Sequence, residues 1–143
     1  MEITIDATNL ILGRLCSYAA KRALESNKVN IINCENAVVS GSKNFILGKY
    51  LHRLDRTNPL RGPFVYSKPD RFVKRAVRGM LPYKQEKGKN AFRRVKCYTG
   101  TPDELSKAKI EALKDANLIN LKIPRFIRVS EICEHLGNKA YKQ

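Results

Sequence analysis

The sequence predicts an α/β fold in which helices pack on a parallel sheet, and three neighbouring segments carry this prediction. Residues 2–5 alternate polar and apolar side chains, as a half-buried strand does. Residues 29–34 are rich in β-branched residues, which is typical of a buried strand. Between them, apolar residues recur at helical spacing over residues 12–24. A helix between two such strands normally makes a right-handed parallel crossover.

The next segments predict a short strand, a helix and a long loop. An apolar run at residues 37–39 leads to Ser42, a suitable N-cap for a helix that turns Leu47, Tyr50, Leu51 and Leu54 inward. Lys49, Arg53 and Arg56 lie on another face of that helix. Residues 56–69 contain three prolines and no periodicity, so they predict a long loop that carries Arg61 and Lys68.

A cationic helix is predicted from Asp70, its expected cap, to Met80. Its apolar stripe contains Phe72, Val73 and Val77, and the opposite side carries Arg71, Lys74, Arg75 and Arg78. Residues 82–90 then predict a second basic loop, with Lys84, Lys87 and Lys89. A helical turn at residues 91–94 and a strand at residues 95–99 follow.

The last third predicts two more helices. Thr101, Pro102 and Glu104 form a capping box before an apolar stripe that continues to Ala116. After an extended piece at residues 126–129, Ser130 is expected to cap a helix over residues 131–136 that Gly137 ends.

Composition indicates one globular domain over residues 1–143. The chain has 43% hydrophobic and 29% charged residues. No apolar run approaches the ~20 residues that cross a bilayer, and the N-terminus lacks the features of a signal peptide, so we expect an intracellular protein without membrane contact. Cys16, Cys34, Cys97 and Cys133 are far apart among apolar neighbours, which predicts buried, reduced thiols and no metal site.

Positive charge is concentrated in the middle of the sequence. Residues 1–42 carry four Lys or Arg against four Asp or Glu, residues 43–100 carry sixteen against three, and residues 101–143 carry eight against six. The three net charges are 0, +13 and +2. Such segregation predicts a surface in residues 43–100 that faces phosphate groups.

Catalytic chemistry is not indicated. His52 and His135 are far apart on predicted helices among charged residues, and the few acids in the basic middle form no carboxylate pair. Nucleotide binding is the best enzymatic alternative for an α/β sheet. However, the first loop has one glycine where a dinucleotide fingerprint has three, and the run Ser40 to Lys43 is too short for a P-loop. We therefore expect no enzyme, no cofactor and no small-molecule substrate.

Nucleic acid is the polyanion that the basic middle fits best. Residues 84–94 combine five basic residues with Gly88 and Phe92. Cations replace the counterions of phosphates, glycines allow close backbone approach, and aromatic rings can stack on bases. For Phe92, Tyr83 and Tyr66, core packing and base stacking both remain open. Irregular basic loops without zinc-finger, zipper or RNP-type motifs favour structured RNA.

The same residues resemble a known family. The block from Val77 to Pro82, the basic residues after it, the run Ala91 to Lys96, and Tyr98 with Gly100 resemble the signature region of the universal large-subunit ribosomal proteins of the L-thirteen family. Three further segments also resemble it: the opening with Asp6-Ala7 and Leu12 to Leu15, the run Asn33 to Gly41, and Arg61 to Phe64. The run Ala91 to Arg94 and the absence of a long basic C-terminal extension are similar to the archaeal form, with a reduced eukaryotic member as the alternative.

This resemblance implies a three-layer α/β/α domain with a small, mainly parallel four-stranded sheet and long basic loops. It also implies contact with large-subunit rRNA and neighbouring ribosomal proteins, a role in assembly and translation, and a place in the cytoplasm. Arg14, the loop at Arg61, Arg78 and the run 84–96 carry over from the family; Lys49, Arg53, Arg71 and Arg75 rest on charge and helical facing alone. The candidate RNA-binding residues are Arg14, Lys43, Lys49, Arg53, Arg56, Arg61, Lys68, Arg71, Arg75, Arg78, Lys84, Lys87, Lys89, Arg93, Arg94 and Lys96. An RNA-binding translational regulator acting off the ribosome is the main alternative, and a nucleotide-binding enzyme is the second.

Overall fold

A three-stranded parallel sheet forms the centre of the molecule. The structure, a computed structural model, describes residues 1–58, 60–122 and 124–137. Its strands β1 (Glu2–Asp6), β2 (Lys28–Ile32) and β4 (Val95–Cys97) lie in the order β1-β2-β4. Both neighbouring pairs are parallel. The α/β class, the three strands and the parallel crossover are therefore confirmed.

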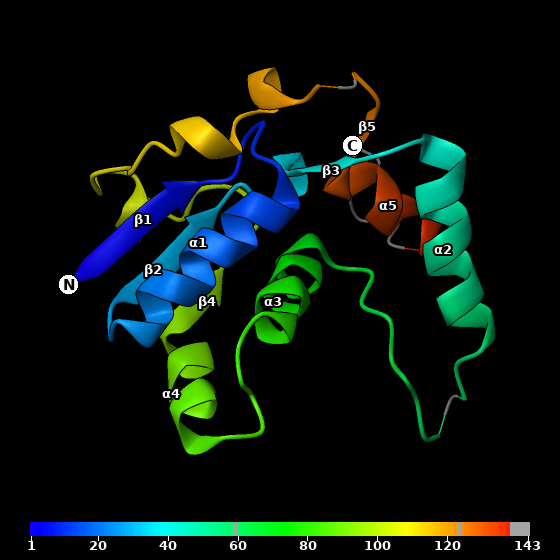
Figure 1. The fold of residues 1–143 in the computed structure, drawn as a ribbon, viewed down its shortest axis with the longest axis horizontal. Helices are drawn as coiled ribbons and strands as arrows, with labels where there is room; N and C mark the ends of the chain where they lie inside the picture. The colour runs from blue at the N-terminus through cyan, green and yellow to red at the C-terminus, as the bar shows by residue number, and fades with distance from the viewer. Residues whose placement is uncertain (59, 123, 138–143) are drawn as a thin grey trace.

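Two helices pack on one face of this sheet (Figure 1). Helix α1 (Leu12–Leu24) connects β1 to β2, and helix α3 (Pro69–Gly79) contacts both α1 and β4. Their facing side chains, among them Leu15, Val73 and Val77, are fully buried. The predicted apolar stripes of both helices therefore form the core. No helix in the described residues is long and apolar enough to cross a membrane.

Truncating Leu15 tests this core. We expect Leu15→Ala to lower the free energy of unfolding by about 3 kcal/mol, because a fully buried side chain leaves a cavity between α1 and its neighbours. Lys21→Ala, at an exposed position of the same helix, should change it by less than about 0.5 kcal/mol. Urea denaturation measures both, and equal effects would contradict the assignment of the core.

The number of strands in the main sheet differs from the prediction of four. Strand β3 (Val38–Ser40) pairs instead with β5 (Phe126–Arg128), and this antiparallel pair forms a second sheet of two strands. The fourth position, beside β1, holds only an isolated parallel bridge between Thr4 and Ile110. Helix α2 (Lys43–Asp55) follows β3 and contacts β5, whereas α5 (Val129–His135) follows β5 and contacts α3.

The predicted helix over residues 101–116 is wrong. The chain forms two short 3-10 helices here, η2 (Asp103–Leu105) and η3 (Lys114–Ala116), and a third, η4 (Leu118–Asn120), follows them. Backbone groups that a helix would use internally bond to distant segments, because Glu111 N–H donates to the Thr4 carbonyl at 2.8 Å and Ala116 accepts from Ile11 N–H at 2.8 Å. These long-range bonds replace the helical ladder.

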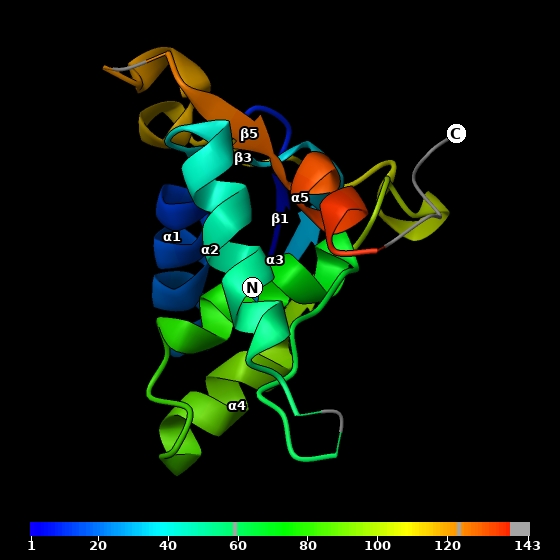
Figure 2. The ribbon, with the colours of Figure 1, turned by 90° about the vertical axis from the view of Figure 1, so that its right-hand side faces the viewer.

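Residues 101–109 supply the third layer. The chain leaves β4 at one edge of the sheet and returns at Ile110 beside the opposite edge, so these residues cross a face of the sheet. Figure 2 shows α1 on one side of β1 and the yellow turn of this segment on the other side. Thr4 and Asn30, which alternate with the apolar side chains of their strands, are each only 3% exposed. In the described residues this face is therefore covered by turns, and not by the second helical layer that the α/β/α resemblance implies.

The predicted loop over residues 82–90 is also wrong in part. Helix α4 (Glu86–Arg94) begins five residues earlier than the helical turn expected at residues 91–94. Gly88 and Ala91 are buried on its inner side, whereas Lys87, Lys89 and Arg93 are exposed. The glycine that indicated a loop lies against the backbone of Pro82 and Tyr83, where a Cβ atom would not fit.

Helix starts and the inner face of α2 differ in detail from the predictions. Ser42 occupies the N-cap position of α2 without a side-chain capping bond, α3 begins at Pro69 with Asp70 in its first turn, and α5 begins one residue before Ser130. In α2 the buried residue is Ile46, whereas two residues expected to face inward are partly exposed: Leu51 at 39% and Leu54 at 38%. Helix α2 therefore packs over a narrow strip.

Three of the four cysteines are buried as predicted, and Cys97 is half-buried. All four are free thiols. Burial raises the pKa of Cys16 and Cys133 to about 12, which keeps both thiols protonated at neutral pH. A hydrogen bond with Cys97, together with burial, also raises the pKa of Cys34. Such thiols behave as small apolar residues of the core.

Candidate nucleic-acid interface

Basic side chains of residues 43–100 lie almost entirely at the surface. All sixteen are exposed except Lys74, Arg78 and Arg94, which are half-buried. Ion pairs in the described residues join Arg22 to Glu25 and Glu111, and Lys43 to Glu131 at 2.9 Å. Among the described residues (1–58, 60–122 and 124–137), Lys43 is thus the one basic residue of segment 43–100 that forms an ion pair with an acidic side chain. The others leave a surface of uncompensated positive charge.

Helices α2, α3 and α4 and the segments between them hold these cations. Helix α3 places Arg71, Lys74, Arg75 and Arg78 opposite its buried stripe, because its sequence is amphipathic with a helical period. Lys49 and Arg53 lie on α2, and Arg93 lies on α4. Four more lie outside the helices, on the segments 56–68 and 80–85: Arg56, Arg61, Lys68 and Lys84.

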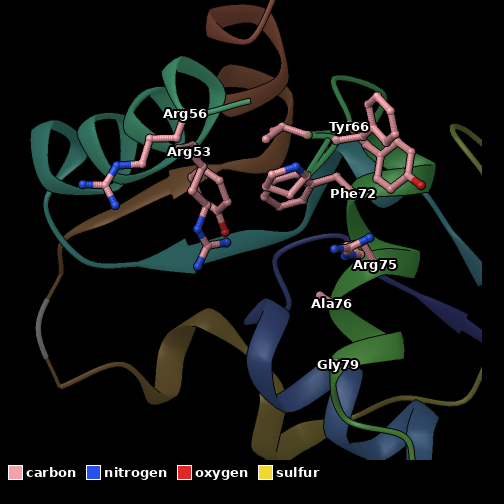
Figure 3. Close-up of a pocket in the computed structure, with 11 residues that line it drawn as sticks. Arg53, Arg56, Tyr66, Phe72, Arg75, Ala76 and Gly79 are labelled. Atoms are coloured by element: carbon pink, nitrogen blue, oxygen red, sulfur yellow. The ribbon is translucent and has the colours of Figure 1, made fainter. Parts of the chain in front are cut away.

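A first hollow of about 450 Å³ opens between α2, residues 63–66 and α3 (Figure 3). Its polar side chains are chiefly arginines, and Figure 3 shows Arg53 and Arg75 extending into the space between the two helices. Tyr50 and Phe72 form part of its wall, with ring centroids 5.1 Å apart. Burial raises the pKa of Tyr50 even though the guanidinium of Arg53 lies near, so its hydroxyl stays neutral. The lining residues are Tyr50, Arg53, Arg56, Pro63, Phe64, Val65, Tyr66, Phe72, Arg75, Ala76 and Gly79.

A second hollow of about 340 Å³ adjoins the first along α3. Tyr66 and Arg75 line both hollows. We call the two together the basic groove; its lining residues include no Asp or Glu. The residues of the second hollow are Tyr66, Arg71, Lys74, Arg75, Arg78 and Phe92. All charged side chains of this concave surface are cations, and it also carries aromatic rings. Such a surface is suited to a polyanion that carries planar groups.

Three cations of this region lie over aromatic rings. Arg78 is 4.4 Å from the ring centroid of Tyr83, Lys74 is 5.1 Å from that of Phe92, and Arg53 is 5.6 Å from that of Tyr50. These contacts hold the charged heads near the groove. The sequence left core packing and base stacking open for three aromatic residues. Phe92 packs against the core and also lines the groove, and Tyr66 lines both hollows. Tyr83 lies outside the hollows and is 38% exposed.

Some predicted residues do not join the groove. Arg14 lies on α1 and donates to the Asp115 carbonyl at 2.6 Å, and Lys43 is paired with Glu131. Lys96 is exposed on β4, beside Asn30 in the register of the sheet. The remaining predicted residues outside the lining are Lys49, Arg61, Lys68, Lys84, Lys87, Lys89, Arg93 and Arg94. The predicted set therefore includes every arginine that lines the groove but covers a wider surface.

Several residues that line the hollows of this surface were absent from the predicted RNA-binding set. Lys74 lines the second hollow and belongs to the predicted cationic face of α3, so helical facing was a sufficient signal for it. Phe64 and Phe72 line the first hollow from different segments. Lys122 and Arg125 lie with Arg14 around a separate hollow at Ser40 to Ser42, and only the tertiary path of the last third brings them there.

The two arginines at the end of α4 should behave differently when replaced. Arg94 donates to the Ala23 carbonyl at 3.3 Å and is half-buried, so Arg94→Ala should cost about 1 kcal/mol of stability. Arg93 is exposed, and Arg93→Ala should change stability by less than about 0.5 kcal/mol while weakening RNA binding. Denaturation and filter binding to an rRNA fragment measure the two effects. Unchanged RNA binding by Arg93→Ala would remove α4 from the interface.

Comparison with known proteins decides the family. The family model for "Ribosomal protein L13" matches residues 1–104. The chain belongs to the ribosomal protein L13 family. Relatives named "Large ribosomal subunit protein uL13" agree with this: the protein of Methanopyrus kandleri is 40% identical over 93% of this chain and 85% of its own length. That of Natronomonas pharaonis is 41% identical over 95% and 91%, and that of Archaeoglobus fulgidus is 38% identical over 93% and 86%.

Membership of this family confirms several predictions from the sequence. The L13 family consists of structural ribosomal proteins and not of enzymes. The three relatives are archaeal, which agrees with the archaeal form expected from the sequence. Although the family model ends at residue 104, the relatives align over more than nine-tenths of the chain, so the last third is also part of the similarity.

Proposed function

We propose that this chain is a structural component of the large subunit of cytoplasmic ribosomes, where it binds and stabilises folded rRNA during assembly and translation. The observation that carries the proposal is the cationic surface of residues 43–100, in which Lys43 is the one basic residue that an acidic side chain neutralises in the described residues. The names of the relatives, all large-subunit proteins, point in the same direction.

The fold suits this role because it separates a rigid part from a binding part. The buried faces of α1 and α3 pack against the sheet, and the opposite face of α3 presents its arginines to the surface. Phosphates bound there would release their counterions, which favours association without any base-specific contact. We propose that neighbouring ribosomal proteins cover other parts of the surface.

Sedimentation of the tagged protein from native cell extract tests the proposal. We expect it to move with the large subunit through a sucrose gradient and to remain there after a high-salt wash, as an integral ribosomal protein does. Recovery at the top of the gradient, or release by mild salt, would instead favour an RNA-binding regulator that acts off the ribosome. Binding of ATP or NAD to the purified protein would favour the nucleotide-dependent alternative.

A further inference from the structure

We infer that the basic groove holds an unpaired stretch of RNA, with bases against Phe64 and Tyr66 and phosphates on Arg53, Arg71 and Arg75. The inference rests on the proposed function and adds to it the form of RNA that this part of the surface takes. Folded rRNA contains both duplex and unpaired regions, and only unpaired bases expose their faces for stacking.

The aromatic part of the groove carries the first step. Phe64 is 56% exposed and lines the first hollow. Tyr66 is half-buried at the junction of the two hollows. Phe72 is 7% exposed and packs near Tyr50, so it forms the wall rather than a free surface. An exposed ring beside a half-buried ring offers apolar area that a planar group can cover.

The charge of the groove carries the second step. Arginines lie at both ends of the first hollow, with Arg53 and Arg56 on the side of α2 and Arg75 on α3. Arg71, Lys74 and Arg78 continue the positive charge along the second hollow. Neither lining contains a carboxylate, so every charged group in it attracts an anion. A chain of phosphates that also carries flat apolar rings matches both properties of the groove.

The dimensions of the groove agree with successive nucleotides. Hollows of about 450 and 340 Å³ fall within the range of ~300–1,000 Å³ found for small-molecule sites. They share Tyr66 and Arg75, so one nucleotide in each hollow would place the connecting phosphate near Arg75. An acidic peptide has comparable charge but lacks a repeated planar ring, so stacking distinguishes it from RNA.

The test compares single strands that differ only in their bases. The probes are a short oligouridine RNA containing one 2-aminopurine, and a strand of the same length whose central sugars lack bases. We expect the full chain to bind the intact strand roughly tenfold more tightly than the abasic strand, and to quench 2-aminopurine fluorescence. Phe64→Ala should remove most of this difference, and Tyr66→Ala should act in the same direction. Leu60→Ala, which removes a 91% exposed side chain of the same segment that does not line the groove, should leave it unchanged.

The outcomes separate this inference from the proposed function. Equal binding of intact and abasic strands, or displacement of the RNA by polyglutamate at equal charge concentration, would overturn the inference while the protein still moves with the large subunit. Loss of base-dependent binding in Phe64→Ala, with an unchanged thermal melting curve, would support it. A wild-type protein that stays at the top of the gradient would overturn the proposed function, whatever the strands show.

Discussion

Raising the salt concentration from 50 to 200 mM is expected to weaken binding of this protein to its rRNA by roughly 10³–10⁵-fold, if ~6–10 phosphates are contacted. The physical reason is counterion release. Each phosphate neutralised by Lys or Arg releases a condensed counterion, and the entropy gained by that release is smaller at higher salt concentration. Filter binding or fluorescence anisotropy at several salt concentrations measures the slope of log affinity against log salt.

Charge removal on the two faces of the molecule makes this prediction specific. Replacing both Arg71 and Arg75 with Ala should reduce the magnitude of the slope by about 2, because each removes about one phosphate contact. Replacing both Lys107 and Lys109, which are exposed on the segment that crosses the opposite face of the sheet, should leave it unchanged. A slope that changes with the lysine pair and not with the arginine pair would place the RNA on the opposite face of the molecule and would contradict binding in the basic groove.

Gly88→Ala is expected to lower the free energy of unfolding by about 3 kcal/mol or more. This substitution adds one methyl group at a position that has no room for it. A Cβ atom at this position would lie 2.0 Å from the Pro82 carbonyl oxygen and 2.9 Å from the Tyr83 nitrogen. Both are backbone atoms, so no side-chain rotation relieves the overlap. Helix α4 must then move away from the turn at residues 80–85.

Gly48→Ala is the matched control for this substitution. Gly48 lies inside helix α2, and a Cβ atom there would have nothing within 4 Å. Alanine should therefore stabilise the protein by about 0.5–1 kcal/mol, since it restricts the unfolded chain and favours the helix. Differential scanning calorimetry should show a Tm lowered by roughly 10 °C for Gly88→Ala and slightly raised for Gly48→Ala. Similar Tm changes for both would show that the close contact at Gly88 does not limit stability.

The same glycine explains one error in the sequence-based prediction. A run with Lys84, Lys87, Gly88 and Lys89 indicates a loop, because glycine disfavours helix and the lysines show no apolar face. The buried residues of α4 are small, Gly88 and Ala91. At Gly88 the helix packs directly against the backbone of Pro82 and Tyr83, without a large apolar side chain between them. Hydrophobic periodicity has no signal for such an interface.

The opposite error occurred at residues 101–116, where local signals were strong. Thr101 and Glu104 fit a capping box, yet the Thr101 hydroxyl donates to Asn33, and the backbone farther on bonds to Thr4 in β1 and to Ile11 just before α1. Of the expected apolar stripe, only Ala116 is buried in this segment. Alanines contribute little buried area, so long-range backbone bonds were more favourable than a helix.

The groove shows the same division between local and long-range information. Arg53, Arg71 and Arg75 were identified from charge and helical facing, but nothing in the sequence shows that α2 and α3 present them to the same basic groove. Phe64 and Tyr66 come from a segment without periodicity, and its path between the two helices depends on contacts distant in sequence.

Local patterns in the chain predicted the α/β class, the parallel strand-helix-strand unit, the basic segment 43–100 and the family, because alternation, helical spacing and charge segregation are properties of neighbouring residues. The division into two sheets, the turns over residues 101–109, the start of α4 and the joining of two hollows into one groove are seen only in the folded chain. Each of these depends on backbone hydrogen bonds and packing distances between segments far apart in the chain, which no local pattern records.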